Sequence, residues 1–223
     1  MLLLKFYLLL TLTSSLINCF NISPIPNIIL KRDGTKTVQN ESRSAFFGYT
    51  INLRKKSVII GAPRSQSVLN SQKNINETGT IYKCDLNSSN VNKECYPYTF
   101  DIFGNRNLDA TNYKFENKEY QMLGASMDGL NSETNKFVVC APNLKDFFNN
   151  YYYMYGICYW VSDTKNENPT KVFQIINSRK NVMGFAQQGF SVHVTENEEF
   201  LIGAPGAELW TGEYWLTNIS TLQ

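Results

Sequence analysis

One pattern occurs three times in the sequence, as Ser57-Val-Ile-Ile-Gly-Ala-Pro63, Lys136-Phe-Val-Val-Cys-Ala-Pro142 and Glu199-Phe-Leu-Ile-Gly-Ala-Pro205. Each copy is a short, continuous apolar run that ends at Ala-Pro. Such a run is typical of a β-strand buried on both faces. The proline ends the strand because it has no N–H to donate to a neighbour. The pattern therefore predicts three buried strands at equivalent positions.

Each run lies inside a larger repeated unit. A glycine and an alternating stretch precede it, as in Tyr49–Leu53 and Phe190–Val194, and this period-two alternation predicts a strand with one face more buried than the other. A loop and a glycine-led aromatic stretch follow, beginning at Gly79, Gly156 and Gly212. Three or four strands recurring about every 65 to 75 residues form a unit the size of a propeller blade. The fold class predicted is all-β.

The N-terminal segment, Met1–Phe20, has the form of a secretory signal peptide, with Lys5 before an apolar run and small or polar residues after it. A membrane anchor is the alternative, but a spanning helix needs about 20 apolar residues. We expect residues 1–19 to be removed by cleavage after Cys19. The mature chain would then begin at Phe20.

Cleavage would leave an even number of cysteines in an oxidising compartment, which indicates disulfides. Four cysteines allow three pairings, and the residues alone do not choose between them. The two short-range pairings would close modest loops. Five sequons also fit secretion. The cysteines are Cys84, Cys95, Cys140 and Cys158, and the candidate glycosylation sites are Asn21, Asn40, Asn76, Asn87 and Asn218.

Composition excludes several kinds of function. The 223 residues carry a net charge of only +2, which leaves no basic stripe for nucleic acid. His193 is the only histidine, so no site built from several imidazoles is possible. It lies on an alternating strand and is expected to be structural, and no nucleophile or paired-carboxylate pattern accompanies it. We therefore expect no enzyme activity. Calcium loops of the Asp-x-Asp-x-Asp-Gly type do not occur either, so no metal or cofactor is expected in this segment.

The repeated windows resemble the FG-GAP repeats of the integrin α-subunit β-propeller. The likeness extends to Phe20-Asn-Ile22, Gly79-Thr-Ile-Tyr-Lys-Cys84, Val138-Val-Cys-Ala-Pro142 and Gly203-Ala-Pro-Gly206, the last followed by Trp210-Thr-Gly212. The resemblance implies a partial β-propeller of about three four-stranded blades, out of seven in the family domain. The repeats would cover approximately residues 20–100, 101–170 and 171–223 and continue beyond the chain. It also implies the disulfides Cys84–Cys95 and Cys140–Cys158.

Two departures from the family pattern qualify the resemblance. The third cysteine pair that the family usually has between blades 2 and 3 is missing from Lys171–Phe185, so a looser connection is expected there. The thirty or so residues from Tyr159 to Phe190 are too few for the inserted ligand-binding domain of some α subunits. The resemblance therefore implies an α subunit without that insert, with calcium sites expected in later blades.

The resemblance implies a cell-adhesion receptor subunit on the extracellular side of a single-pass membrane protein. It would pair with an integrin β subunit and bind matrix or cell-surface ligands. The β-subunit contacts carried over are Tyr49, Met122 and Phe190, although these could instead be core side chains. Leu209 and Trp210 occupy the family's ligand-contact turn, with Leu209 where the family has an aromatic residue.

The aromatic segment Asn143–Tyr155, predicted to be a loop, adds Tyr152 and Tyr153 as candidate ligand contacts because so many aromatic residues are unusual in a solvent loop. The alternative is a loop that folds over the rim of the blade. Two other functions compete with a receptor subunit. One is a secreted lectin-like propeller, and the other is the accessory propeller of a secreted phospholipase related to the glycosylphosphatidylinositol-specific enzyme.

Overall fold

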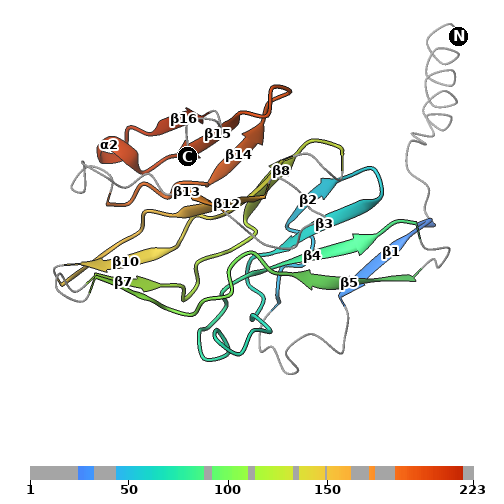
Figure 1. Ribbon diagram of the computed structural model, residues 1–223, viewed down its shortest axis with the longest axis horizontal. Helices are drawn as coiled ribbons and strands as arrows, with labels where there is room; N and C mark the ends of the chain where they lie inside the picture. Colours follow the sequence, from blue (N-terminus) through green and yellow to red (C-terminus); the bar gives the residue numbers. More distant parts are fainter. Residues whose placement is uncertain are drawn as a thin grey trace, which may run out of the picture.

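The computed structural model describes residues 25–32, 44–87, 92–109, 114–132, 136–148, 150–161, 171–173 and 184–217. The predicted signal peptide (1–19) and the sequons at Asn21, Asn40 and Asn218 lie outside these residues. The described chain is mostly β-structure and forms four sheets (Figure 1). This agrees with the β-rich class expected from the sequence. No helix among the described residues is long and apolar enough to cross a membrane.

Three sheets, which we call the first, second and third repeat sheets, correspond to the three sequence repeats. The first has the order β1-β5-β4-β3-β2, with β1 (Ile29–Arg32), β2 (Thr50–Leu53), β3 (Ser57–Ala62), β4 (Thr80–Asp85) and β5 (Asn92–Tyr98). The second has the order β13-β12-β9-β8, with β8 (Ser126–Gly129), β9 (Phe137–Ala141), β12 (Ile157–Val161) and β13 (Lys171–Phe173). The third pairs β14 (Ser191–Val194), β15 (Phe200–Ala204) and β16 (Glu213–Thr217).

Strand numbers differ from the four per blade that the resemblance implied. The first repeat sheet has a fifth strand because β1 pairs in parallel with β5, Ile29 lying opposite Asn92. The third has three strands among the described residues. Both disulfides join directly opposed residues of neighbouring antiparallel strands, as Cys84–Cys95 between β4 and β5 and Cys140–Cys158 between β9 and β12. This is the pairing that the resemblance implied.

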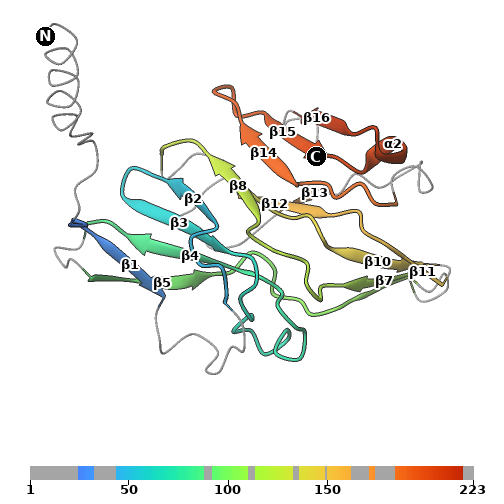
Figure 2. The same ribbon diagram turned by 180° about the vertical axis from the view of Figure 1, so that it is seen from behind.

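The repeat sheets pack face to face in chain order. Ile59 and Ile81 of the first sheet meet Phe137 and Val139 of the second in one apolar core. The opposite face of the second sheet packs against the third in another core, formed by Val138, Cys140, Cys158, Trp160, Val194, Phe200 and Ile202. The strands β2, β8 and β14 lie side by side in both views (Figure 1, Figure 2).

Burial of the third repeat sheet corrects one expectation. Its apolar run at Phe200–Ile202 was predicted to be buried on both faces, yet Leu201 is only half-buried while Phe200 and Ile202 are buried. On the face of Leu201, Leu216 of β16 is exposed. The reason is that no described sheet covers this face, whereas β9 lies between two sheets and is buried throughout.

A fourth sheet, which we call the hairpin sheet, was not predicted. It has the order β11-β10-β7-β6, with β6 (Asn107–Asp109), β7 (Lys114–Asn117), β10 (Lys145–Phe148) and β11 (Tyr151–Tyr153). The segment Asn143–Tyr155 is therefore largely a β-hairpin, and its prediction as a loop was wrong. Asn150, in the left-handed region at φ 65°, occupies the turn, which asparagine tolerates better than most residues. The hairpin sheet and β1 lie at opposite ends of the molecule (Figure 1, Figure 2).

Candidate functional site: the loop edge of the repeat sheets

The same turn precedes the first strand of each repeat. The turn begins with a residue in the left-handed region, whose carbonyl accepts the N–H of the residue three positions later. The glycine two positions after the left-handed residue donates its N–H to a carbonyl of the strand that ends at Ala-Pro. The left-handed residues are Phe46 (φ 56°), Met122 (φ 61°) and Gln187 (φ 49°), and the glycines are Gly48, Gly124 and Gly189. The sequence repeat is thus also a repeat of backbone geometry.

The loop that follows each Ala-Pro is tied to this turn in the same way in all three repeats. The residue after the proline donates its N–H to the carbonyl three residues before the glycine, at 3.1 to 3.3 Å. The three pairs are Arg64–Ala45, Asn143–Gln121 and Gly206–Ala186. The connections 64–78, 143–155 and 206–211 therefore leave their sheets beside the three turns, and we call them the three loops although the second contains the β10–β11 hairpin. We call the surface formed by these loops and turns the loop edge.

Successive sheets also contact each other in a repeated way. Thr50 Oγ1 donates a hydrogen bond to the carbonyl of Gly124 at 2.7 Å, and Ser126 Oγ donates one to the carbonyl of Gly189. Isolated parallel bridges join Gly79 to Leu123 and Gly156 to Gln188. The hydroxyl residue was missed in the sequence, although a threonine or serine stands two positions after the glycine in every repeat, including Ser191.

His193 takes part in one of these contacts between sheets. Its Nδ1 lies 2.8 Å from Asp128 Oδ2, and the same oxygen accepts the N–H of Val194 at 2.8 Å. The histidine is exposed, while Asp128 is half-buried on β8. The pair thus links β8 to β14, which agrees with the structural role expected for His193.

The three candidate β-subunit contacts lie on the loop edge but differ in exposure. Tyr49 and Phe190, each directly after a repeat glycine, are 56% and 60% exposed. Met122 is half-buried, and its sulfur accepts a hydrogen bond from Asn143 Nδ2 at 3.0 Å. Tyr49 and Phe190 can therefore offer aromatic surface to a partner, whereas Met122 mainly supports the second loop.

Sequence reasoning missed an aromatic neighbour of Tyr49. Phe46 stacks on Tyr49 with ring centroids 6.2 Å apart. The guanidinium of Arg64 lies 5.0 Å from the centre of the Phe46 ring and is held there by Glu77 through hydrogen bonds of 2.8 and 3.1 Å. These hydrogen bonds raise the pKa of Arg64, so the group is cationic at any physiological pH. Phe46 lies before the repeat glycine Gly48 and carries no sequence signal that separates it from the repeat.

Tyr152 and Tyr153 point to opposite faces of the hairpin sheet, because neighbouring residues in a strand alternate. Tyr152 is exposed and extends a row of rings with Phe147 at 5.0 Å, which in turn lies 6.3 Å from Phe115. Tyr153 stacks on Tyr155 at 5.5 Å and packs against a small apolar group formed by Tyr155, Ala186, Ala204 and Ala207. Of these two tyrosines, Tyr152 therefore exposes most of its ring to a ligand, whereas Tyr153 is partly buried.

The third loop contains an unusual backbone. Glu208, Leu209 and Trp210, within the short α2 (Ala207–Trp210), all have positive φ, at 49°, 59° and 72°. Left-handed conformations cost non-glycine residues about 1–2 kcal/mol each, and such strain concentrates at binding sites. Leu209 and Trp210 are 71% and 67% exposed, and Trp210 stacks on Phe185 at 6.1 Å. The turn therefore presents two apolar side chains in a fixed geometry.

A buried ionic cluster anchors the segment between the first repeat sheet and the hairpin sheet. The ammonium of Lys118, which is fully buried, lies 2.5 Å from Asp101 Oδ2 and donates to the carbonyls of Phe103 and Gly104. The Tyr159 hydroxyl also reaches Asp101, at 3.1 Å. Complete burial, together with the negative charge of Asp101, raises the pKa of Tyr159 well above its ordinary value. Because its charges are paired, the cluster is a structural feature.

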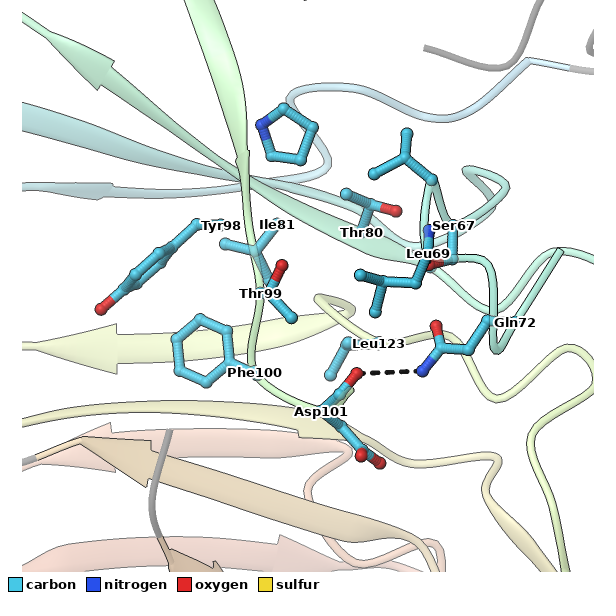
Figure 3. Close-up of a pocket in the computed structure, with 13 residues that line it drawn as sticks. Ser67, Leu69, Gln72, Thr80, Ile81, Tyr98, Thr99, Phe100, Asp101 and Leu123 are labelled. Carbon is cyan, nitrogen blue, oxygen red and sulfur yellow. Dashed lines mark hydrogen bonds between the residues drawn. The ribbon is translucent and has the colours of Figure 1, made fainter. Parts of the chain in front are cut away.

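A small cavity lies beside this cluster (Figure 3). Its volume is about 20 Å³, and its lining includes Thr80, Tyr98, Phe100 and Leu123. Gln72 closes one side by donating to the Asp101 carbonyl at 3.0 Å. A space of this size holds about one water molecule and no larger ligand. The described residues contain no group of three or more His, Cys, Asp or Glu side chains that could hold a metal ion.

These features define a β-sheet repeat protein that presents exposed aromatic and apolar side chains on the loops of successive sheets. No family model matches the chain. It is 40% identical over 217 residues to integrin alpha-PS3 of Drosophila melanogaster, a match that covers 88% of this chain and 19% of the relative. Integrin alpha-PS5 of the same species is 41% identical over 202 residues, covering 86% of this chain and 18% of the relative.

A more distant relative is integrin alpha-V of Gallus gallus, 28% identical over 196 residues that cover 79% of this chain and 17% of the relative. The chain is homologous to integrin α subunits over most of its length. It spans less than a fifth of the length of each of these curated relatives.

Proposed function

We propose that this chain is the N-terminal part of a cell-adhesion receptor subunit that pairs with an integrin β subunit and binds extracellular ligands. The observation that carries the proposal is the 40% identity to an integrin α subunit across 88% of the chain. The role is binding and involves no catalysis. Residues 1–19 would direct the chain into the secretory pathway, and the two disulfides suit an extracellular protein.

In this proposal the three repeat sheets are blades of a β-propeller that begins near residue 20. Two observations support that arrangement. The sheets stack face to face in chain order, and the same hydroxyl-to-glycine contact recurs at both junctions. The hairpin sheet is then an addition to the blades, built from the connection before β8 and the loop after β9.

The β subunit would bind the loop edge at Tyr49 and Phe190, with Met122 supporting the surface between them. The two exposed aromatic rings lie just before β2 and β14, on either side of β8, and offer large apolar area. Their faces attract a cationic side chain. The ligand would contact Leu209, Trp210 and Tyr152. Tyr153 would act indirectly, by holding β11 against the apolar group beside the third loop.

Capture of a soluble integrin β-subunit ectodomain by the secreted chain tests the pairing. Tyr49→Ala and Phe190→Ala are each expected to weaken capture by about 2 kcal/mol, which is roughly thirtyfold in Kd. Tyr96→Ala is the matched control, because Tyr96 is a similarly exposed tyrosine on β5. Equal capture by all four proteins would reject this surface, and no capture by any of them would reject the pairing.

A further inference from the structure

The first of the three equivalent loops carries a sequon where the other two carry the proposed ligand contacts. Asn76 lies in loop 64–78 and is exposed. Loop 143–155 carries Tyr152, and loop 206–211 carries Leu209 and Trp210. Because all three loops leave their sheets beside the same kind of turn, a group attached to Asn76 would be on the loop edge with the binding residues. We infer that an N-glycan on Asn76 covers part of the loop edge and limits access to it.

Contacts of Asn76 place that glycan close to the second repeat. Its carbonyl accepts the N–H of Tyr120 at 3.1 Å, and Tyr120 is two residues before Met122. The ammonium of Lys145, the first residue of β10, lies 5.9 Å from the centre of the Tyr120 ring. The glycan therefore starts between the proposed β-subunit surface and the hairpin sheet that carries Tyr152.

The side chain of Asn76 is also oriented. Its Nδ2 donates a hydrogen bond to Glu119 Oε1 at 3.1 Å. A primary amide has two N–H groups, so one remains after a sugar is attached and the bond to Glu119 can persist. This bond fixes the orientation of the side-chain amide from which the glycan would extend.

The third residue of the sequon is no longer accessible in the folded chain. Thr78 is fully buried, and its hydroxyl hydrogen-bonds to the carbonyl of Gly79 at 3.3 Å. Attachment at Asn76 must therefore precede folding of its loop.

Asn87, an exposed sequon asparagine after β4, provides a comparison, because it lies on the β4–β5 connection and not on the loop edge.

The inference rests on the proposed function, and its experiment separates the two. Glycopeptide mass spectrometry of the secreted chain should show Asn76 occupied. Asn76→Gln and enzymatic deglycosylation should each accelerate labelling of Lys145 by an amine-reactive reagent several-fold. Labelling of Lys55, at the far end of β2, should not change, and Asn87→Gln should change neither lysine.

Access of a partner is measured by β-subunit capture, which should increase for Asn76→Gln and not for Asn87→Gln. An unoccupied Asn76, or an unchanged rate at Lys145, overturns the inference even if the β subunit binds. Equal capture by wild type and Asn76→Gln also overturns it. Failure of every variant to bind any β subunit counts against the proposed function, and the Lys145 rate still decides where the glycan lies.

Discussion

The three repeat glycines form a natural series for testing how the sheets pack. All three have positive φ, so a change to alanine costs each of them about 1–2 kcal/mol of backbone strain. They differ in what a new methyl group would meet. At Gly48 nothing lies within 4 Å. At Gly124 the nearest atom is the movable end of Ile81, at 2.9 Å, and at Gly189 it is the fixed Cβ of Cys140, at 2.3 Å.

Overpacking of a rigid core costs about 1–3 kcal/mol. We therefore expect Gly48→Ala to lower the free energy of unfolding by about 1–2 kcal/mol, Gly189→Ala by about 2–5 kcal/mol, and Gly124→Ala by an intermediate amount. Urea unfolding of the oxidised proteins, followed by tryptophan fluorescence, measures the series. Equal losses at the three glycines would refute the close packing of the second and third sheets at the Cys140–Cys158 disulfide.

Three further predictions concern the cluster and the loop edge. Lys118→Met should destabilise the chain by about 3–5 kcal/mol, because it leaves Asp101 buried without its cation; a urea midpoint equal to that of wild type would contradict this. Burial, with a contribution from the neighbouring Tyr153 and Asp146, raises the pKa of Tyr155 from 10.0 to about 12. The unfolded chain then loses this proton first, so the stability it provides is present below pH 10 and is lost as pH rises toward 12; Tyr155→Phe should show a smaller decline over that range. Tyr153→Ala should lower the thermal midpoint while Tyr152→Ala leaves it unchanged, and only Tyr152→Ala should weaken ligand binding without loss of stability.

The repeat strands could be predicted because their signals are local. A continuous apolar run such as Val58–Ile60, closed by Ala-Pro, predicts a strand from local sequence alone, and β3, β9 and β15 all form where such runs occur. The burial of each face could not be predicted in the same way, since it depends on which sheet packs there. Leu201 shows this, because its run resembles the other two and yet one face stays partly exposed.

The hairpin sheet was missed because its stabilising contacts are distant in sequence and its polarity is reversed. β7 pairs with β10 about thirty residues later, and no local pattern reports that pairing. Its inner face buries Glu116 and Asp146, whereas Tyr152 and Phe115 on the outer face are exposed. The usual rule that apolar residues face the interior would place Phe115 and Tyr152 inside and the two carboxylates outside, which is the opposite of the observed arrangement. The buried charges are tolerated because ionic partners such as Arg106 and Lys118 lie beside Glu116.

The turn at Leu209 and Trp210 could be located from the sequence only by resemblance. Its three left-handed residues include no glycine or asparagine, so these residues themselves give no signal for the left-handed conformation. The conformation is imposed by tertiary contacts: Gly206 donates to the Ala186 carbonyl at 3.2 Å, and Trp210 stacks on Phe185. Gly206 is required there because a Cβ would collide with the Phe185 carbonyl.

The hydroxyl contacts between the repeat sheets run from each repeat to the next, and this helps to separate the two proposed binding surfaces. Thr50 and Ser126 each reach forward to the glycine of the next repeat, so each repeat is in contact mainly with its neighbours, as in other repeat proteins. The position of the turn with Trp210 depends on how the second and third sheets pack together, whereas Tyr49 lies at the edge of the first sheet. A substitution confined to the first sheet can therefore weaken β-subunit pairing and leave the ligand surface in place, whereas damage at the Gly189 junction affects both.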